Sequence, residues 1–333
     1  MLAAWYEKTG PARDVLRYGE VPAPEPGPGE VRVRVHASGV NPTDTKQRTG
    51  RPRPGGPALA FPRIIPHQDG AGVIDRVGQG VSPARIGERV WIYESQWQRP
   101  SGTAAQYTTV PAERAVPLPA DVDFAAGACL GIPAITAHYC LFADGPVTDR
   151  TVLVQGAAGA VGYYAAQLAR LAGARVVATV GSAEQERLVR DAGIAQVIDR
   201  KRQDVKARVL AMTEGRGVDR IIEVALAANL DTSAEVLALN GVIATYASDS
   251  EPQPPPPLPF RPLLFKNATI RFVLVYLVSP EAHRAAARDI GAHLASGSLK
   301  HSIARRFPLS RIAEAHEVME AGHLNGKVII DVP

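Results

Sequence analysis

The sequence is poor in cysteine and has no long apolar runs. Its 333 residues include two cysteines, Cys129 and Cys140, too few for a disulfide scaffold or a zinc-finger set. No apolar run reaches the roughly 18–20 residues that a membrane-spanning helix needs. The first residues lack the basic segment and apolar stretch of a secretory signal. We therefore expect a cytoplasmic protein with no membrane partner.

A strong excess of charge of one sign is also absent. The 37 basic and 33 acidic residues give a formal net charge of +4, and the basic residues form no tract. Nucleic acid is therefore not an expected partner. Hydrophobic residues make up 46% and charged residues 21%, a balance typical of globular proteins. At roughly 150 residues per domain, the length predicts two domains.

The first 120 residues read as short strands separated by glycine and proline. Residues 31–37 alternate apolar and polar side chains, the period of a half-buried strand, and residues 70–78 and 88–93 are further strand candidates. Such a pattern predicts a compact, barrel-like β domain. Residues 123–141 are rich in alanine and predict helix, with Pro133 as an interruption.

Strands and helices then alternate from residue 151 to residue 247. This order predicts a parallel sheet covered by helices on both faces. The proline-rich segment 251–262 is interpreted as a connecting loop rather than an extended linker for a partner. The predicted strands are 151–155, 175–180, 196–198, 220–224, 241–247, 269–278 and 327–332, and the predicted helices include 161–172, 183–192 and 281–296.

The strongest motif is a glycine-rich turn between the strand at 151–155 and the following helix. Small residues there let a ligand approach the backbone, and the helix start offers free N–H groups to a pyrophosphate. A flanking strand, a flanking helix and a further strand about 20 residues on are all present, so a dinucleotide site is favoured over a simple packing turn. The expected cofactor contacts in the turn are Gly156, Ala158, Gly159, Ala160, Val161 and Gly162.

The end of the next strand favours NADPH over NADH. Sites for NAD usually place Asp or Glu there to bind the ribose hydroxyls, whereas residues 179–183 contain no acid. Ser182, Arg187 and Arg200 are near enough in sequence to bind a 2′-phosphate, which the planar guanidinium matches well. Each arginine could instead be an ordinary solvated charge.

Several stretches resemble the medium-chain dehydrogenase/reductase superfamily, and in particular its zinc-independent quinone oxidoreductase branch, which includes zeta-crystallin. This resemblance implies an α/β protein with a GroES-like, β-rich catalytic domain (1–122 and 262–333) and a doubly wound Rossmann domain (123–261). It also implies a cleft between them and a homodimer. The matching stretches are Gly39–Asp44, Asp69–Ile74, Val110–Glu113, Gln155–Gly162 and Gly326–Val328.

The resemblance also implies that no metal is bound. Zinc-dependent relatives carry catalytic ligands where this chain has Asn41, Gln68 and a position near Ala128. These residues supply neither thiolate nor imidazole, which zinc sites need. A substitute set of His67, Asp69 and Cys129 is conceivable but disfavoured.

Four residues are candidates for the catalytic chemistry. By resemblance, Asn41 could orient the acceptor oxygen or the nicotinamide ribose, although it could also be a turn residue before Pro42. Asp44 resembles an acid near the cleft, with an Asx-turn role as the alternative. Lys46 replaces the tyrosine of many relatives and could donate a proton or be solvated. Tyr93 is a second candidate donor, with a core aromatic role favoured.

Further cofactor contacts are carried over by resemblance. Thr136 matches a position near the nicotinamide, Gly181 and Ser182 would lie by the adenosine ribose, and Arg200 by the adenine end. Asn229 could reach the cofactor, although the matching position could be Ala227. The remaining expected contacts are Tyr246, Ala247, Ser248, Val273, Leu274 and Val275.

The predicted strand 269–278 is long and apolar, and exposed it would promote aggregation. Pairing across a twofold axis, as in the family, would cover it, so we expect a homodimer. The leading hypothesis is a metal-free NADPH:quinone oxidoreductase. One alternative is an NADPH-dependent reductase of activated C=C bonds in enones or enoyl thioesters. Another is a non-catalytic cofactor-binding or RNA-binding relative.

Overall fold

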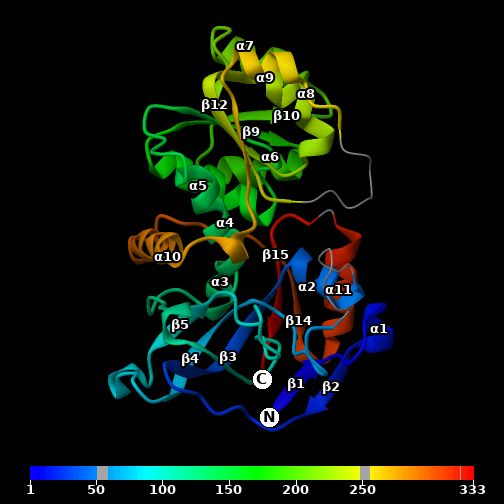
Figure 1. Cartoon of the computed structure of the whole chain (residues 1–333), viewed down its shortest axis with the longest axis vertical. Coiled ribbons are helices and arrows are strands. Elements are labelled where there is room, and N and C mark those ends of the chain that lie inside the picture. The colour runs from blue at the N-terminus through cyan, green and yellow to red at the C-terminus, as the bar shows by residue number, and fades with distance from the viewer. Residues whose placement is uncertain (51–58, 248–255, 323) are drawn as a thin grey trace. The chain divides into compact units, whose positions relative to one another are not determined.

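The computed structural model describes residues 1–50, 59–247, 256–322 and 324–333. These residues form two compact units (Figure 1). Unit 1 comprises Met1–Ile132 and Ala287–Pro333, and unit 2 comprises Pro133–Ala286. A search of the described ranges finds no helix that is both long and apolar enough to cross a membrane.

Unit 1 is organised around β3 (Glu30–Val40), which pairs antiparallel with β4 (Asp69–Val77), β6 (Tyr107–Pro111) and β15 (Lys327–Asp331). The larger sheet has the order β14-β15-β3-β4-β5-β7, with β6 also on β3. The other elements are β1 (Leu2–Trp5), α1 (Ala12–Val15), β2 (Arg17–Glu20), α2 (Pro42–Thr49), η1 (Pro83–Arg85), β5 (Arg89–Ile92), η2 (Ala112–Arg114), β7 (Ala115–Pro117), α3 (Phe124–Gly127), β14 (Ile303–Pro308), η4 (Leu309–Arg311) and α11 (Ile312–Ala321).

The pairing register of β3 decides which residues meet at its end. Gly39 lies opposite Asp69 on β4, and Val40 lies opposite Val328 on β15. The beginnings of β4 and β15 therefore lie beside the end of β3. Segments that are more than 250 residues apart in sequence are thus brought to one place.

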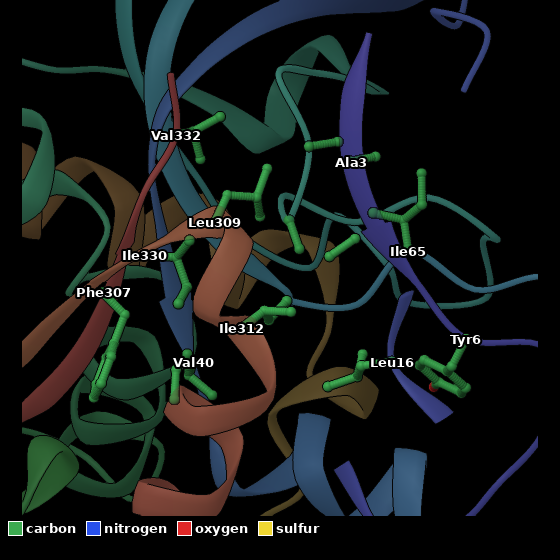
Figure 2. Packing of buried hydrophobic residues seen from close by; sticks show 14 of the residues in the cluster. Ala3, Tyr6, Leu16, Val40, Ile65, Phe307, Leu309, Ile312, Ile330 and Val332 are labelled. Atoms are coloured by element: carbon green, nitrogen blue, oxygen red, sulfur yellow. The ribbon is translucent and has the colours of Figure 1, made fainter. Parts of the chain in front are cut away.

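Both ends of the chain contribute to one hydrophobic core of unit 1. Figure 2 shows Ala3 and Tyr6 from the N-terminal segment close to residues of β3, β14, β15 and α11. Tyr6 and Val40 are buried in this cluster together with Phe307, Ile312 and Ile330. Burial of apolar area on this scale is the main favourable contribution to folding. The C-terminal segment is therefore an integral part of unit 1.

Unit 2 contains a six-stranded parallel sheet of order β10-β9-β8-β11-β12-β13. This is the strand order 3-2-1-4-5-6 of the doubly wound dinucleotide-binding fold, as predicted. The strands are β8 (Thr151–Val154), β9 (Arg175–Val180), β10 (Gln196–Asp199), β11 (Val218–Glu223), β12 (Leu237–Thr245) and β13 (Thr269–Phe272). The helices are α4 (Gly131–Phe142), α5 (Ala160–Leu171), α6 (Ala183–Asp191), α7 (Val205–Met212), α8 (Leu226–Val236), α9 (Phe260–Phe265), η3 (Val275–Leu277) and α10 (Pro280–Ala295), of which α4 and α10 extend across the unit boundaries.

The strand predicted at 269–278 is shorter than expected. β13 ends at Phe272 because its parallel partner β12 ends at Thr245, whose carbonyl accepts the Val273 N–H. The chain then turns, with the Leu277 N–H donating to the Leu274 carbonyl. The apolar run alone could not reveal where the partner strand stops.

The two units of the structure also differ in their limits from the predicted domains. The resemblance implies that residues 262–286 belong to the catalytic domain, but β13 pairs with β12 and therefore belongs to unit 2. The first boundary lies after Ile132 rather than after residue 122. Pro133 does not interrupt a helix, because α4 begins at Gly131 and proline is tolerated in a first helical turn.

Candidate functional site

A buried ion pair lies where β3, β4 and β15 meet in unit 1. The Lys327 Nζ donates to Asp69 Oδ2 at 2.6 Å and to Asn41 Oδ1 at 2.5 Å. Asn41 Nδ2 donates to the same Asp69 oxygen at 2.8 Å. All three residues are at most 2% exposed. We call this group the Asn41–Asp69–Lys327 cluster.

The second carboxylate oxygen of Asp69 is also bonded. Asp69 Oδ1 accepts the Ile132 N–H at 2.8 Å, at the start of α4. Gly131 permits this approach, since a Cβ there would lie 2.1 Å from Asp69 Oδ1. Gly39 similarly leaves space for the lysine, because its Cβ would lie 2.8 Å from Lys327 Cε. A buried charge pair is tolerable only when its remaining polar atoms are satisfied in this way.

Asp44 lies next to the cluster in the first turn of α2. Its Oδ2 accepts the Asn41 backbone N–H at 2.7 Å. Its Oδ1 is buried and has no hydrogen-bond partner in the described part of the chain. Burial, assisted by the negative charge of Asp69, raises the pKa of Asp44 to about 8. Asp44 therefore holds a proton at neutral pH.

A chain of hydrogen bonds approaches Asp69 from its backbone side. The Arg48 guanidinium donates to His316 Nδ1 at 3.3 Å, and His316 Nε2 lies 2.9 Å from His67 Nε2. Because Arg48 can only donate, His316 carries its proton on Nε2 and donates to His67. Burial lowers the pKa of both histidines, that of His316 to about 3, so both are neutral.

The same chain continues through two hydroxyl groups. His67 accepts on Nε2, so its Nδ1 carries the proton and donates to Ser38 Oγ at 2.8 Å. Ser38 Oγ lies 2.7 Å from Thr103 Oγ1, which donates to the Asp69 carbonyl at 2.5 Å. His67 has φ +82°, a strained value for a non-glycine residue. The hydrogen bonds of its ring to Ser38 and His316 hold this backbone conformation. His67 lies two residues before Asp69.

In unit 2 the predicted phosphate-binding turn follows β8. Gly156 adopts φ +68°, and a Cβ on Gly162 would lie 2.5 Å from the Gly156 carbonyl oxygen. Thr179 on β9 holds the turn, since its Oγ1 accepts the Gly156 N–H at 3.1 Å. Gly159 is the N-cap of α5 and has no side chain to occupy the first N–H groups of the helix. Ala158, Ala160 and Val161 lie in the same turn and helix start.

Of the residues expected at the ribose and its phosphate, Gly181, Ser182 and Arg200 lie near the end of β9. Ser182 is the N-cap of α6, and its Oγ accepts the Gln185 N–H at 3.3 Å. Arg200 Nη2 lies 3.3 Å from the position that a Cβ on Gly181 would take. Arg187 is exposed on α6. In the part of the chain described, neither arginine has a carboxylate partner, whereas the neighbouring Arg190 and Arg202 pair with Glu186 and Asp199.

The other predicted cofactor residues of the sheet follow strands whose carboxyl ends share this edge. Tyr246 and Ala247 follow β12, and Val273, Leu274 and Val275 follow β13. Asn229 uses one side-chain N–H internally, donating to Glu223 Oε1 at 2.9 Å. Ser248 lies outside the described residues. Parallel α/β sheets bind ligands at this edge.

The candidate proton donors lie in different surroundings. Tyr93 is 3% exposed, and its hydroxyl donates to the Glu113 carbonyl at 3.4 Å, an arrangement that favours the core role. Lys46 is half-buried on α2. Thr136, the cofactor contact expected near the nicotinamide, is buried on α4.

Asp69 and Lys327 both lie in stretches that resemble the family, but the sequence analysis assigns no role to Lys327. One feature of the sequence could have indicated its burial. Lys327 stands directly before an apolar strand, and a lysine in such a position needs a buried partner. Ser38, Thr103 and His316 carried no signal, because residues joined in the bonded chain are up to 268 positions apart.

Known proteins with a similar sequence or fold agree with this two-unit architecture. Residues 27–120 match the alcohol dehydrogenase GroES-like domain, and residues 160–292 match the zinc-binding dehydrogenase family. The chain is 32% identical to quinone oxidoreductase from Rattus norvegicus over 93% of this chain and 91% of the relative.

Solved structures with a similar fold include oxidoreductases of the same kind. One titled as Escherichia coli quinone oxidoreductase complexed with NADPH has a TM-score of 0.84 and 25% identity, covering 99% of this chain and 100% of that one. An NAD-dependent alcohol dehydrogenase has a TM-score of 0.88 and 27% identity over all of both chains.

The GroES-like unit and the doubly wound Rossmann unit together define an oxidoreductase of the medium-chain dehydrogenase/reductase superfamily. Within it, the chain belongs to the quinone oxidoreductase family of zeta-crystallin-like proteins. The resemblance that the sequence motifs predicted is therefore confirmed.

The zinc named by the matched family does not fit this chain. Asn41 and Gln68 bond to other side chains, Gln68 Nε2 donating to Gln96 Oε1 at 3.1 Å, and Ala128 has no ligand atom. Burial raises the pKa of the Cys129 thiol to about 12, so no thiolate is available. No group of three metal-binding side chains occurs among the residues described. The ammonium of Lys327 already lies against Asp69.

The pKa of Asp44 predicts a pH dependence of stability. The folded-state pKa of about 8 lies above the value of 3.8 expected when unfolded, so the contribution of Asp44 to stability is lost as pH rises toward 8. Asp44→Asn keeps the acceptor for Asn41 and does not ionise. Its stability relative to the wild type should increase by up to about 1.4 kcal/mol per pH unit between about pH 5 and about pH 8, then level off. Urea unfolding across this range measures it, and a constant difference would contradict the assignment.

Proposed function

We propose that this protein reduces a quinone by hydride transfer from NADPH, without a metal. The observation that carries the proposal is the end of β9, where no acidic residue stands and Arg200 lies beside Gly181. An acid there would repel a 2′-phosphate, whereas a guanidinium binds it. The similar quinone oxidoreductase structure with NADPH supports the same cofactor.

The residues of unit 2 would hold this cofactor at the carboxyl edge of the sheet. The turn from Gly156 to Gly162 would take the pyrophosphate on backbone N–H groups and on the start of α5. Gly181 and Ser182 would lie at the adenosine ribose, and Arg187 and Arg200 at the 2′-phosphate. When bound, NADPH supplies the hydride. The protein then has to bind NADPH and the acceptor and to orient them for this transfer.

An electron-poor acceptor suits a site with no Lewis acid. Hydride addition to a quinone places negative charge on an oxygen, and hydrogen-bond donors can stabilise it. An enone would place charge on an oxygen in the same way, so reduction of an activated C=C bond is the alternative outcome of the test. We propose that Asn41, Asp44 and Lys46 lie around the acceptor, while the buried hydroxyl of Tyr93 makes it the weakest candidate.

The test follows NADPH absorbance with purified protein in EDTA, offering 9,10-phenanthrenequinone, 1,4-benzoquinone and a simple enone in parallel. We expect rapid oxidation with the quinones. Oxidation with the enone alone would assign the protein to C=C reduction. Binding of NADPH without turnover of any acceptor would contradict the proposal.

The cofactor preference predicts an effect of Arg200→Ala. Loss of a charge-assisted hydrogen bond to the 2′-phosphate should raise the KM for NADPH by about tenfold or more and leave the KM for NADH unchanged. Arg202→Ala is the matched control, because Arg202 already pairs with Asp199. Equal effects of Arg200→Ala on both cofactors would contradict a role at the 2′-phosphate.

We also propose a homodimer formed through residues 269–278. β13 is an edge strand of the unit 2 sheet, and Phe272 and Leu277 are 77% and 73% exposed. Exposed apolar edges of this kind are commonly covered by a partner. Size-exclusion chromatography with light scattering should give a dimer that Phe272→Lys dissociates, whereas Ile86→Lys, at an exposed position in unit 1, should not dissociate it. A monomeric wild type would overturn the proposal.

A further inference from the structure

A small surface cavity of unit 2 lies at the edge of the sheet opposite to the glycine-rich turn. The residues that line it come from the end of α5, the start of β9, the turn after α6 and the start of β10, and its volume is about 200 Å³. β9 has six residues, which span about 20 Å at ~3.3 Å per residue. Parallel α/β sheets bind their cofactors at the carboxyl edge. The cavity is therefore separate from the predicted cofactor site.

Two arginines give this cavity a positive charge. Arg170, in the last turn of α5, lies against the turn after α6, since its Nε is 3.1 Å from the position that a Cβ on Gly193 would take. Arg175 is the first residue of β9. Neither guanidinium has a hydrogen bond or an ion pair within residues 1–50, 59–247, 256–322 and 324–333, and no acidic residue of these ranges lines the cavity. Two unpaired cations in one small cavity favour an anion.

A second hollow of unit 2 also contains arginines, but its own acidic residues neutralise them. There Arg190 pairs with Glu186 at 2.8 Å, and Arg202 pairs with Asp199 at 3.5 Å. These carboxylates would repel an anion and already occupy the guanidinium groups. The feature that distinguishes the first cavity is therefore the lack of a described carboxylate facing its arginines.

Gln196, the first residue of β10, adds an unsatisfied acceptor to the first cavity. Its Oε1 is buried and has no hydrogen-bond partner among the residues that the structure describes. A buried acceptor without a donor lowers stability. A rotation of the flexible side chain would turn this oxygen into the cavity, where a ligand hydroxyl could donate to it. The site therefore combines two cations with one acceptor.

We propose that this cavity binds inorganic hydrogen phosphate, with its charged oxygens on Arg170 and Arg175 and its hydroxyl donating to Gln196. This dianion carries two charges for two guanidinium groups and one hydroxyl for one acceptor. The cavity is smaller than the ~300–1,000 Å³ typical of sites for drug-sized ligands, which suits a small ion. The bound ion would join the end of α5 to the starts of β9 and β10. The inference does not depend on the proposed reaction.

Two related anions test the role of the hydroxyl. Sulfate has the shape and charge of hydrogen phosphate but no hydroxyl. Methyl phosphate, a monoester, loses its last hydroxyl proton with a pKa of about 6, so it also lacks this donor at about pH 7.5. Both should therefore bind more weakly than hydrogen phosphate.

The first experiment titrates the full-length ¹⁵N-labelled protein with phosphate, sulfate or methyl phosphate at about pH 7.5 and constant ionic strength. Phosphate should shift the backbone amide signals of Gly193 and Gln196 to saturation, with a Kd at least about tenfold lower than that of the other two anions. Equal Kd values for phosphate and sulfate would overturn the proposal, as would shifts confined to Gly159 and Gly181 at the opposite edge of the sheet.

The second experiment assigns the contacts. Arg170→Ala and Arg175→Ala should each raise the Kd for phosphate by about tenfold or more, and both side chains are exposed, so the fold should be kept. Gln196→Leu keeps the size of the side chain and should abolish the preference for phosphate over sulfate. Arg202→Ala, in the second hollow, is the matched control and should change the Kd by less than about twofold. A Kd that responds to Arg200→Ala but not to Arg170→Ala would refute the site.

Discussion

The buried ion pair between Lys327 and Asp69 is the interaction on which the organisation of unit 1 depends. Removing two charges from water is costly, and their attraction compensates only where every remaining polar atom is bonded. Here Asp69 receives hydrogen bonds from Lys327, Asn41 and Ile132. The pair joins the start of β4 to the start of β15, across 258 positions in sequence. It therefore requires β15, from the C-terminal segment, to pair with β3.

The rest of unit 1 supports this pair from the backbone side. The hydrogen bonds from Arg48 through His316, His67 and the Ser38 and Thr103 hydroxyls run in one direction and end on the Asp69 carbonyl. The two histidines are neutral and add no charge to the interior, and the charge of the buried Arg48 guanidinium is paired with Glu320. The strained backbone of His67 is held by the same bonds. The chemistry proposed for Asn41 thus rests on residues that themselves need not touch the substrate.

Sequence reasoning succeeded where the signal was local. The glycine-rich turn from Gly156 to Gly162 and the parallel, doubly wound sheet of unit 2 follow from patterns within about 30 residues. It failed where a partner distant in sequence decides the outcome. The length of β13 depends on where β12 ends, and the bond from Asn229 depends on Glu223 at the end of β11. The position of Lys327 before an apolar strand hints at burial, but the sequence does not identify its partner Asp69, which lies 258 positions away.

The most direct test of this account is a double-mutant cycle on the unfolding free energy with Asp69→Asn, Lys327→Met and the double variant. Each single variant leaves one charge buried and unpaired, so each should cost about 3–5 kcal/mol. The double variant should cost at least about 2 kcal/mol less than the sum of the two. Additive losses would contradict the claim that this pair organises the catalytic unit.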